Sequence, residues 1–381
     1  MRSNLELIKE CDSSGTLQFL PLYILNSPPH LTSPPPPQPK QTNQQTNIYL
    51  LSPHRFPYPG TPEHTALIPT LYTLLYTPSN TSTPIPIGYL PTPVHDALLS
   101  VPAAITGPLS SNSTSRTIEA FTQPTEPERS SAVAQTCTSW REQKTFAVLS
   151  GWRNELYPVY GPSPSHELLF NIERSASPLF GVVTYGVHMS CYTKLSPSEQ
   201  AASNTSYNFK MWIPRRSRQK QTYGGLLDNT VAGGIASGES PFESLIREAD
   251  EEASLPSTLV RSQTIAAGTV TYIYLRDSRA GGETNLVQPE VQYVYDLELP
   301  KDVVPQPKDG EVEEFYLWSV EKVKLALKEE IQIENTKRNL AESRDQLPIQ
   351  RKMPTHPEIE VVFRTNSYTS TSRSVQILQE A

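Results

Sequence analysis

The sequence predicts an α/β fold, in which a layered sandwich fills the second half of this 381-residue chain and a smaller α+β region precedes it. Three observations lead there. An amphipathic helix is expected over residues 241–254, directly after a glycine turn. Apolar and polar residues alternate over Thr269–Arg276 and Val291–Leu299, as in strands, and Glu314–Trp318 is a third such run. From Thr138 onward the proline-rich texture gives way to runs rich in β-branched and aromatic residues.

Composition and charge limit the kinds of partner and compartment. The net charge of -7 argues against nucleic acid as the main partner. The cysteines Cys11, Cys137 and Cys191 lie far apart, which fits a reducing compartment and indicates neither a disulfide framework nor a zinc site. No run approaches the roughly 18 apolar residues of a membrane helix, and Met1–Cys11 lacks a signal-peptide core. We expect a cytoplasmic protein that binds no membrane; the oligomeric state is open.

The first 136 residues are expected to be the loop-rich N-terminal part of an accessory domain. Most of the 37 prolines lie here. Residues 27–47 are a low-complexity insertion rich in Pro, Gln and Thr, which should be extended and without a core. From Ile48 to Gln135 short apolar patches alternate with Pro/Ser/Thr loops. This pattern fits a small loop-rich domain or a largely disordered region, and we favour the domain.

Residues 137–205 are expected to complete the accessory domain. Leu168–Arg174 and Leu179–Met189 are enriched in β-branched and aromatic residues between Gly and Pro, which predicts two strands and a hairpin-like region. A further domain is expected over residues 206–330, and its last helix begins at Val320. The chain then turns polar, and residues 331–381 are predicted to be a divergent, disordered tail apart from Ile359–Phe363.

The helix at 241–254 has clear signals at both ends. Ser240 is a natural N-cap and Pro241 suits the first helical position, where its missing N–H costs nothing. Glu243 can close a capping box with Ser240, and Pro256 ends the helix. Spacings of three and four residues place an apolar stripe on one face, made of Phe242, Leu245, Ile246 and Ala249.

The same helix carries a cluster of carboxylates. Glu248, Glu251 and Glu252 stand at i, i+3 and i+4, so their side chains crowd one patch although like charges at this spacing repel. Converging carboxylates suit Mg²⁺, which prefers hard oxygen ligands and substrate phosphates. A solvated acidic helix would give the same triplet by chance, so the surrounding pattern decides.

That surrounding pattern resembles the Nudix box: Gly, five residues, Glu, seven residues, Arg-Glu, an aliphatic residue, any residue, Glu-Glu, any residue, Gly and an aliphatic residue. Its positions are occupied here by Gly233, Glu239, Arg247, Glu248, Ala249, Glu251, Glu252, Ser254 and Leu255. Every spacing matches. Ala249 is small for the aliphatic position, and Ser254 replaces a glycine that would adopt a left-handed conformation, at a cost of roughly 1 kcal/mol. The resemblance implies a Nudix α/β/α sandwich.

The resemblance also implies roles for individual residues. Mg²⁺ or Mn²⁺ would be held by Glu248, Glu251 and Glu252, and Arg247 would orient these carboxylates. Glu239 would brace the junction between loop and helix or join the metal network through water. Either Glu252 or Glu248 would be the general base. A further carboxylate often comes from a later loop, for which the candidates are Glu311, Glu313 and Glu314.

A basic run just before the box is a candidate substrate contact. Four cations within six residues could neutralise a diphosphate: Arg215, Arg216, Arg218 and Lys220. The glycine pair that begins the box, Gly233 and Gly234, follows them and is also a candidate substrate contact. A solvated basic turn is the alternative, and the two are evenly matched. A stacking wall for substrate rings is possible among several aromatic residues, although such residues more often form core: Trp140, Trp152, Trp212, Phe180 and Tyr185.

A second, narrower resemblance lies before the box. The runs Gly151–Gly161, Ile172–Ala176, Leu179–Met189 and Phe209–Ser217 look like the domain that precedes the Nudix domain in thiamine-pyrophosphokinase-related Nudix proteins. The branch implies a pyrophosphatase for oxo- or oxythiamine diphosphate, and no kinase domain is expected here. The alternatives are a pyrophosphatase for ADP-ribose or another nucleoside-diphosphate-linked substrate, and a non-catalytic diphosphate-binding module.

Overall fold

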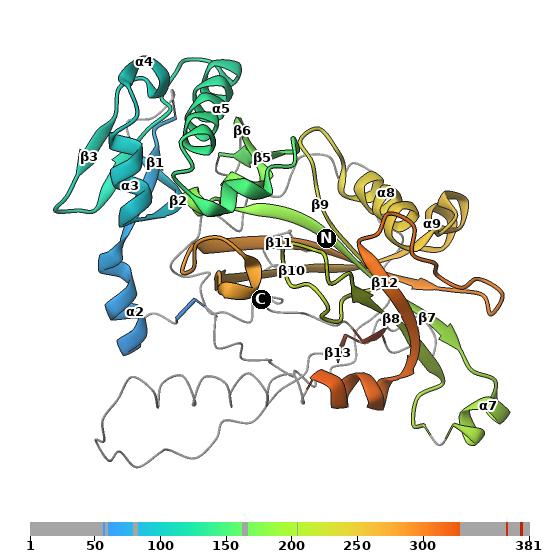
Figure 1. Cartoon of the computed structure of the whole chain (residues 1–381). Helices are drawn as coiled ribbons and strands as arrows, with labels where there is room; N and C mark the ends of the chain where they lie inside the picture. Colours follow the sequence, from blue (N-terminus) through green and yellow to red (C-terminus); the bar gives the residue numbers. More distant parts are fainter. Residues whose placement is uncertain are drawn as a thin grey trace, which may run out of the picture.

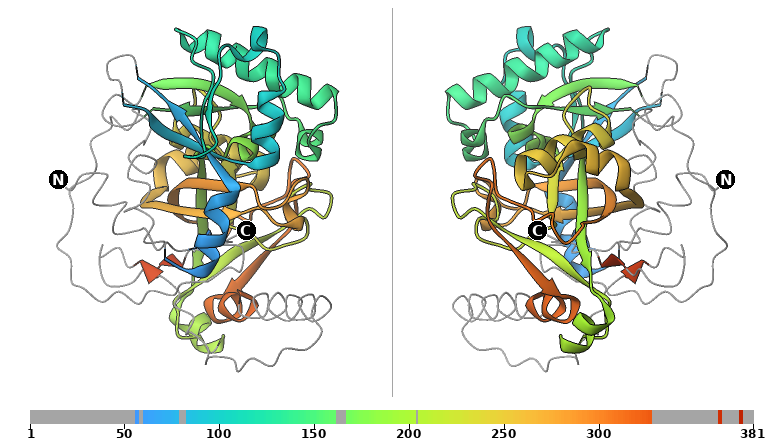
Figure 2. Two further views of the ribbon diagram at one scale, coloured as in Figure 1. Left: turned by 90° about the vertical axis from the view of Figure 1, so that its left-hand side faces the viewer. Right: turned by 90° about the vertical axis from the view of Figure 1, so that its right-hand side faces the viewer.

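The computed structural model describes residues 56–57, 60–78, 83–161, 167–203 and 205–327, together with the short strands at 363–364 and 374–375. The low-complexity insertion at 27–47 lies outside the described residues, as does the tail after residue 327 apart from those two strands. Figure 1 and both views of Figure 2 show two neighbouring parts, with the N-terminal part above one end of a large sheet. Within the described residues, no helix combines the length and apolar character needed to cross a membrane.

The N-terminal part is a folded domain, as favoured from the sequence. Its sheet has the order β2-β1-β4-β3. Its elements are α2 (Pro62–Leu67), η2 (Ile68–Thr70), β1 (Leu71–Tyr76), β2 (Ile85–Pro91), α3 (Thr92–Leu99), α4 (Ala103–Thr106), β3 (Ser110–Asn112), β4 (Thr117–Glu119) and α5 (Glu126–Glu142). The 17-residue α5 starts with a capping box between Thr125 and Glu128 and crosses the boundary expected at residues 136 and 137.

A hairpin and several short turns join this part to the large sheet. The hairpin strands β5 (Leu156–Tyr160) and β6 (Leu168–Glu173) are antiparallel, which agrees with the hairpin-like region expected there. The short elements around them are η3 (Ala147–Gly151), η4 (Arg174–Ala176) and α6 (Ser177–Phe180). Side chains of the hairpin and of α5 share one apolar core, which includes Trp140, Ile172 and Phe180.

The second part is built on a six-stranded mixed sheet with the order β10-β11-β7-β8-β12, in which β9 pairs with β7. The strands are β7 (Thr184–Lys194), β8 (Phe209–Arg216), β9 (Val231–Gly234), β10 (Ile265–Leu275), β11 (Val287–Glu298) and β12 (Val312–Ser319). The sheet therefore begins with β7, inside the 137–205 range expected for the accessory domain. Long-range pairing with β8, β9 and β11 places β7 at its centre.

Helices cover this sheet and complete the sandwich. The helices α8 (Pro241–Ala253) and α9 (Ser257–Gln263) pack on it through a core that includes Leu245, Ala249 and Val260. Residues 320–327 form the expected helix after β12. Its side chains Val320, Val323 and Leu327 pack against Met211 and Ile213 of β8. The short elements α7 (Pro197–Ala202) and η5 (Ser278–Ala280) lie in the connections.

The two parts are joined by direct contacts. The carboxylate of Glu283, after η5, accepts hydrogen bonds from the backbone N–H groups of Ala147 and Val148 at 2.6 and 3.0 Å. Leu286 of the second part is buried in the apolar core of the first. These contacts place η3 and α6 of the N-terminal part beside the ends of β7, β10 and β11.

Candidate active site

The carboxylate-bearing helix α8 forms as its sequence predicts, with one difference at the start. The Ser240 hydroxyl accepts a hydrogen bond from the Glu243 N–H at 3.3 Å. The reciprocal half of the expected capping box is absent, because both oxygens of Glu243 accept from Arg261 at 2.7 and 2.6 Å. An ion pair with the neighbouring α9 has therefore replaced the local contact.

The end of α8 shows how Ser254 replaces the glycine of the box. Ser254 has φ of 53°, the left-handed conformation expected for this position. The Leu255 N–H then reaches back to the Ala249 carbonyl at 3.0 Å, which closes the helix. The Ser254 hydroxyl donates to the carbonyl oxygen of Gln306 at 2.9 Å. This hydrogen bond offsets part of the strain, and the helix end is preserved.

Arg247 organises three carboxylates. Its Nε and Nη2 donate to the two oxygens of Glu239, each at 2.9 Å, in a bidentate pair. Its Nη1 donates to Glu248 and to Glu251, each at 3.0 Å. The hydrogen bonds from Arg247 lower the pKa of Glu239 and keep it ionised. Glu239 also accepts from the Ser244 hydroxyl at 2.5 Å, so it braces the start of α8.

Two of the three clustered carboxylates are buried. Glu248 is 8% exposed and Glu252 is 4% exposed. Burial raises the pKa of Glu248 to about 7, against the opposing effects of Arg247 and Arg174. Burial also raises the pKa of Glu252 to about 8, against Lys220 and the hydrogen bond from the Ala232 N–H. The nearby cations therefore do not compensate for the burial of the two ionised carboxylates. A bound metal cation would stabilise their ionised forms and lower both pKa values.

The chemistry of these groups fits a hard divalent cation, although they do not converge into a ready-made cluster. Among the described residues, no group of three His, Cys, Asp or Glu side chains is arranged to hold a metal ion. Glu251 is engaged by Arg247, and its side chain is 46% exposed. A cation already stands near Glu252, where the Lys220 ammonium lies 3.7 Å from its Oε1. Carboxylate oxygens beside a lone cation are the donors that Mg²⁺ or Mn²⁺ prefers.

The side chains of the basic run before the box do not all point to the same site. Lys220 lies between Glu252 and Glu311, and Arg216 pairs with Asp228 at 2.5 Å on the wall of a cavity. Arg215 does not join them: it donates to the Tyr316 hydroxyl at 3.1 Å and to the Gly225 carbonyl at 2.7 Å. Successive side chains of β8 point to opposite faces, so the two neighbouring arginines cannot serve one site.

Of the three later carboxylates proposed from the sequence, Glu311 is the one at the site. Burial would raise its pKa, but Lys220 and Arg153 overcome this effect and lower the pKa below its usual value. Glu313 instead pairs with exposed Arg218 at 2.7 Å, and Glu314 accepts a hydrogen bond from Tyr316 on the outer side of β12.

The two glycines of β9 face opposite sides of the sheet. A Cβ at Gly233 would lie 2.1 Å from Cδ of Glu248, so this position must be bare for the carboxylate to fit. A Cβ at Gly234 would lie 1.9 Å from the hydroxyl oxygen of Tyr157, on the other side. The strand is therefore a thin wall between the carboxylates and the hairpin of the N-terminal part.

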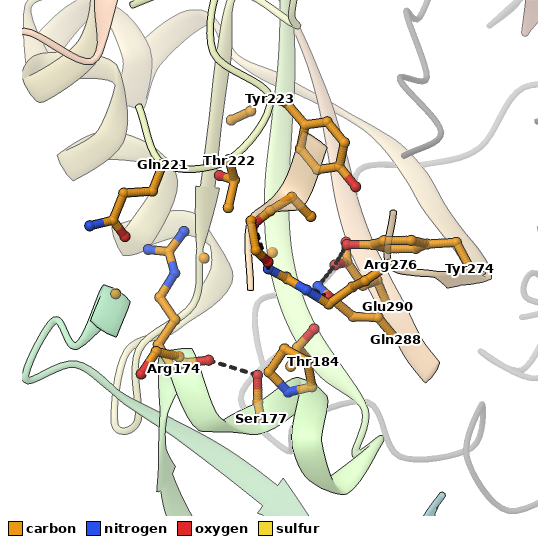
Figure 3. Close-up of a pocket in the computed structure, with 18 of the residues that line it drawn as sticks. Arg174, Ser177, Thr184, Gln221, Thr222, Tyr223, Tyr274, Arg276, Gln288 and Glu290 are labelled. Atoms are coloured by element: carbon orange, nitrogen blue, oxygen red, sulfur yellow. Dashed lines mark hydrogen bonds between the residues drawn. The ribbon is translucent and has the colours of Figure 1, made fainter. Parts of the chain in front are cut away.

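A cavity of about 420 Å³ lies on the Tyr157 side of this wall, between the two parts of the chain. The N-terminal part contributes Tyr157 to its lining. Figure 3 shows Arg174 and Ser177 from the same part, and Thr184, Tyr274 and Glu290 from the sheet. Sequence reasoning missed most of these residues. One sequence pattern could have indicated them: Gln288, Glu290 and Gln292 alternate with apolar residues, which predicts that all three lie on one polar face of a strand.

The aromatic residues considered as a stacking wall are mainly core. Trp140 and Phe180 are buried in the N-terminal core, and Trp212 is buried in the core under α8. Trp152 lies under the guanidinium of Arg141 instead. Tyr185 lines the cavity and also belongs to the apolar core under α8.

Comparison with known proteins identifies two segments. Residues 200–340 match the NUDIX domain, and residues 113–184 match a domain of unknown function, DUF4743. The chain is 39% identical over 181 residues to Nudix hydrolase 20, chloroplastic, of Arabidopsis thaliana, covering 48% of this chain and 43% of that protein. It is 38% identical over 176 residues to Nudix hydrolase 24, chloroplastic, of the same plant, covering 46% and 43%.

A yeast relative extends the match. The uncharacterized protein YJR142W of Saccharomyces cerevisiae is 34% identical over 204 residues, covering 52% of this chain and 56% of that protein. The chain thus spans about half the length of the curated relatives that it matches. The two plant relatives are called chloroplastic, so the cytoplasmic location expected from the sequence stays a prediction. The box, the sandwich and these matches together establish that the chain contains a Nudix domain.

Proposed function

We propose that this chain is a metal-dependent Nudix pyrophosphatase that hydrolyses a small-molecule diphosphate to a monophosphate and phosphate. The observation that carries the proposal is the set of carboxylates on α8, gathered by Arg247 and set beside Lys220 and a cavity lined by arginines. We further propose an oxidised or analogue form of thiamine diphosphate, such as oxo- or oxythiamine diphosphate, as the substrate. This choice is supported by the runs before the box, which resemble the thiamine-pyrophosphokinase-related branch.

The residues of the site divide the chemical work among them. Mg²⁺ or Mn²⁺, held by Glu248, Glu251 and Glu252, would supply the charge that offsets the phosphates and favours attack by water. Arg247 fixes the carboxylates through its hydrogen bonds. Lys220 adds positive charge beside Glu252. Either Glu252 or Glu248 would act as the general base that takes a proton from the attacking water.

The test is substrate turnover by the purified chain with Mg²⁺. Phosphate release follows the hydrolysis of oxothiamine diphosphate, oxythiamine diphosphate and thiamine diphosphate, and formation of AMP follows the hydrolysis of ADP-ribose, which yields AMP and ribose 5-phosphate. We expect the thiamine analogues to be turned over fastest and EDTA to abolish release. Glu251→Gln and Glu252→Gln should each lower the rate about 100-fold or more, because each removes a charge that the transition state needs. Glu243→Gln is the matched control on the same helix, since its carboxylate is exposed and pairs with Arg261 on the surface.

Three results would change the conclusion. Faster turnover of ADP-ribose would replace the thiamine analogues with a nucleoside-diphosphate-linked substrate. Metal-dependent binding without hydrolysis of any of the four compounds would make the chain a non-catalytic diphosphate-binding module. Unchanged hydrolysis by Glu252→Gln would remove the metal role given to α8.

A further inference from the structure

The sheet that carries β9 has one apolar face and one polar face. On β7, Tyr185 and Val187 enter the core under α8, whereas Thr184, Gly186 and His188 line the cavity. On β11, Val291 and Tyr293 enter the same core, and Gln288, Glu290 and Gln292 line the cavity. A polar sheet face usually meets water. Here the N-terminal part covers the polar face. An apolar face would be more stable in this buried position, so the polar side chains need another explanation.

Glu290 is the centre of the polar face. Its Oε2 accepts from the Tyr272 hydroxyl at 2.7 Å and from Gln292 Nε2 at 2.8 Å. Its Oε1 accepts from the Tyr274 hydroxyl at 3.2 Å and from Gln288 Nε2 at 2.5 Å. Each oxygen already has two donors, so Glu290 orients its neighbours and has little capacity left for a ligand.

This orientation leaves polar atoms without partners in the cavity wall. Because the amide N–H₂ of Gln292 faces Glu290, its Oε1 is buried with no hydrogen bond among the described residues. In the same wall, His188 Nδ1 and the Tyr223 hydroxyl are buried and find no hydrogen-bond partner in the described part of the chain. Such groups cost free energy unless something satisfies them, and a cluster of them beside a cavity points to a ligand with hydrogen-bonding edges.

The shape of the cavity favours a flat group. Gly186 pairs with Gly234 across β7 and β9, and because neither residue has a side chain, Gln292 Oε1 and the Tyr157 hydroxyl lie directly against the backbone there. Tyr272 and Tyr223 stand on the walls, where their rings can lie against a planar ligand. A volume of about 420 Å³ falls within the range of small-molecule sites and would hold one such ring with its phosphates.

Arg174 is the arginine that the short turn η4 of the N-terminal part contributes to the cavity wall. Figure 3 shows its side chain extending toward Gln221 and Thr222, across the cavity from Glu290. Its Nη1 donates to Glu155 at 2.9 Å, and its guanidinium lies over the Tyr157 ring, 5.5 Å from the ring centre.

We propose that the N-terminal part completes the substrate site: the cavity between the two parts binds a planar, hydrogen-bonding ring of the substrate, and Arg174 binds the adjoining phosphate. This inference rests on the proposed function and deepens it. An organic diphosphate would then lie with its ring on the polar face of β7 and β11. Its phosphates would extend from Arg174 toward the carboxylates of α8.

The test measures equilibrium binding with Mg²⁺ by calorimetry, using ligands that cannot be hydrolysed. Methylenediphosphonate represents the phosphates alone, and methylene-bridged analogues of thiamine diphosphate and ADP add a ring. Arg174→Ala should weaken all of them about tenfold or more, and Arg174→Lys should recover part of the loss. Gln292→Met and Tyr223→Phe should weaken only the ring-bearing ligands. Arg261→Ala is the control, because it removes an arginine from a surface ion pair.

The outcomes separate this inference from the proposed function. Wild-type affinity of folded Arg174→Ala for methylenediphosphonate would overturn the role of Arg174, even if the chain hydrolyses diphosphates. Equal affinity of the wild type for ringless and ring-bearing ligands would overturn the ring site. If no substrate is hydrolysed but the variants behave as expected, the shared site stands and the proposed enzymatic function falls.

Discussion

Replacing Glu252 with glutamine should stabilise the metal-free protein at neutral pH while it destroys activity. Glu252 is 4% exposed, and its pKa rises from 4.5 to about 8 on folding. A carboxylate with a raised folded pKa contributes its full stability below the unfolded value near 4.5. That stability is lost as the pH rises toward 8, because the unfolded chain releases the proton more readily.

The size of the effect follows from the shift. Between pH 5 and pH 7 the group is ionised in the unfolded chain and protonated in the fold, so each pH unit costs about 1.4 kcal/mol. The wild type should therefore lose about 3 kcal/mol over this range relative to Glu252→Gln, which has no proton to release. Other ionisable groups are common to both proteins, so their contributions cancel in the comparison.

Urea unfolding in excess EDTA, followed by circular dichroism at pH 5 and pH 7, measures this difference. The free energy of unfolding of Glu252→Gln should rise relative to wild type by about 3 kcal/mol between the two pH values. Glu243→Gln should show no such gain, because that carboxylate is exposed. Mg²⁺ should then stabilise the wild type and leave Glu252→Gln unchanged. A variant that gains nothing at pH 7 would refute the claim that a buried charge is waiting for a cation.

Two further substitutions test the site and its helix. In steady-state kinetics, Gly233→Ala should displace Glu248 and lower kcat about 100-fold. Gly234→Ala should instead collide with Tyr157 and mainly raise KM. If both variants changed kcat and KM alike, the assignment of the two glycines to opposite faces of β9 would be contradicted. Ser254→Ala should cost about 1 kcal/mol in thermal unfolding, since it keeps the left-handed strain and loses a hydrogen bond, and Ser254→Gly should be nearly neutral; equal losses would show that the strain is negligible.

Local features of this protein were predictable because they depend on neighbours in the sequence. The helix at 241–253, its N-cap at Ser240 and the left-handed Ser254 follow from spacing and backbone preferences. The strands after the box were predicted by alternation and were confirmed. The N-terminal fold was only partly predictable, since α5 carries few of the apolar positions that mark an amphipathic helix.

The sequence by itself determined the box, its carboxylates and the α/β class, because their spacing is fixed by the period of a helix or a strand. Only the tertiary structure decided which distant groups meet them. Side chains alternate along β8, so Arg216 points into the cavity and Arg215 points to the other face. The loop after β8 places Lys220 beside Glu252 and Glu311. The place of Arg174 depends on the packing of the N-terminal part against the sheet, and no local pattern encodes a contact between residues so far apart in the chain.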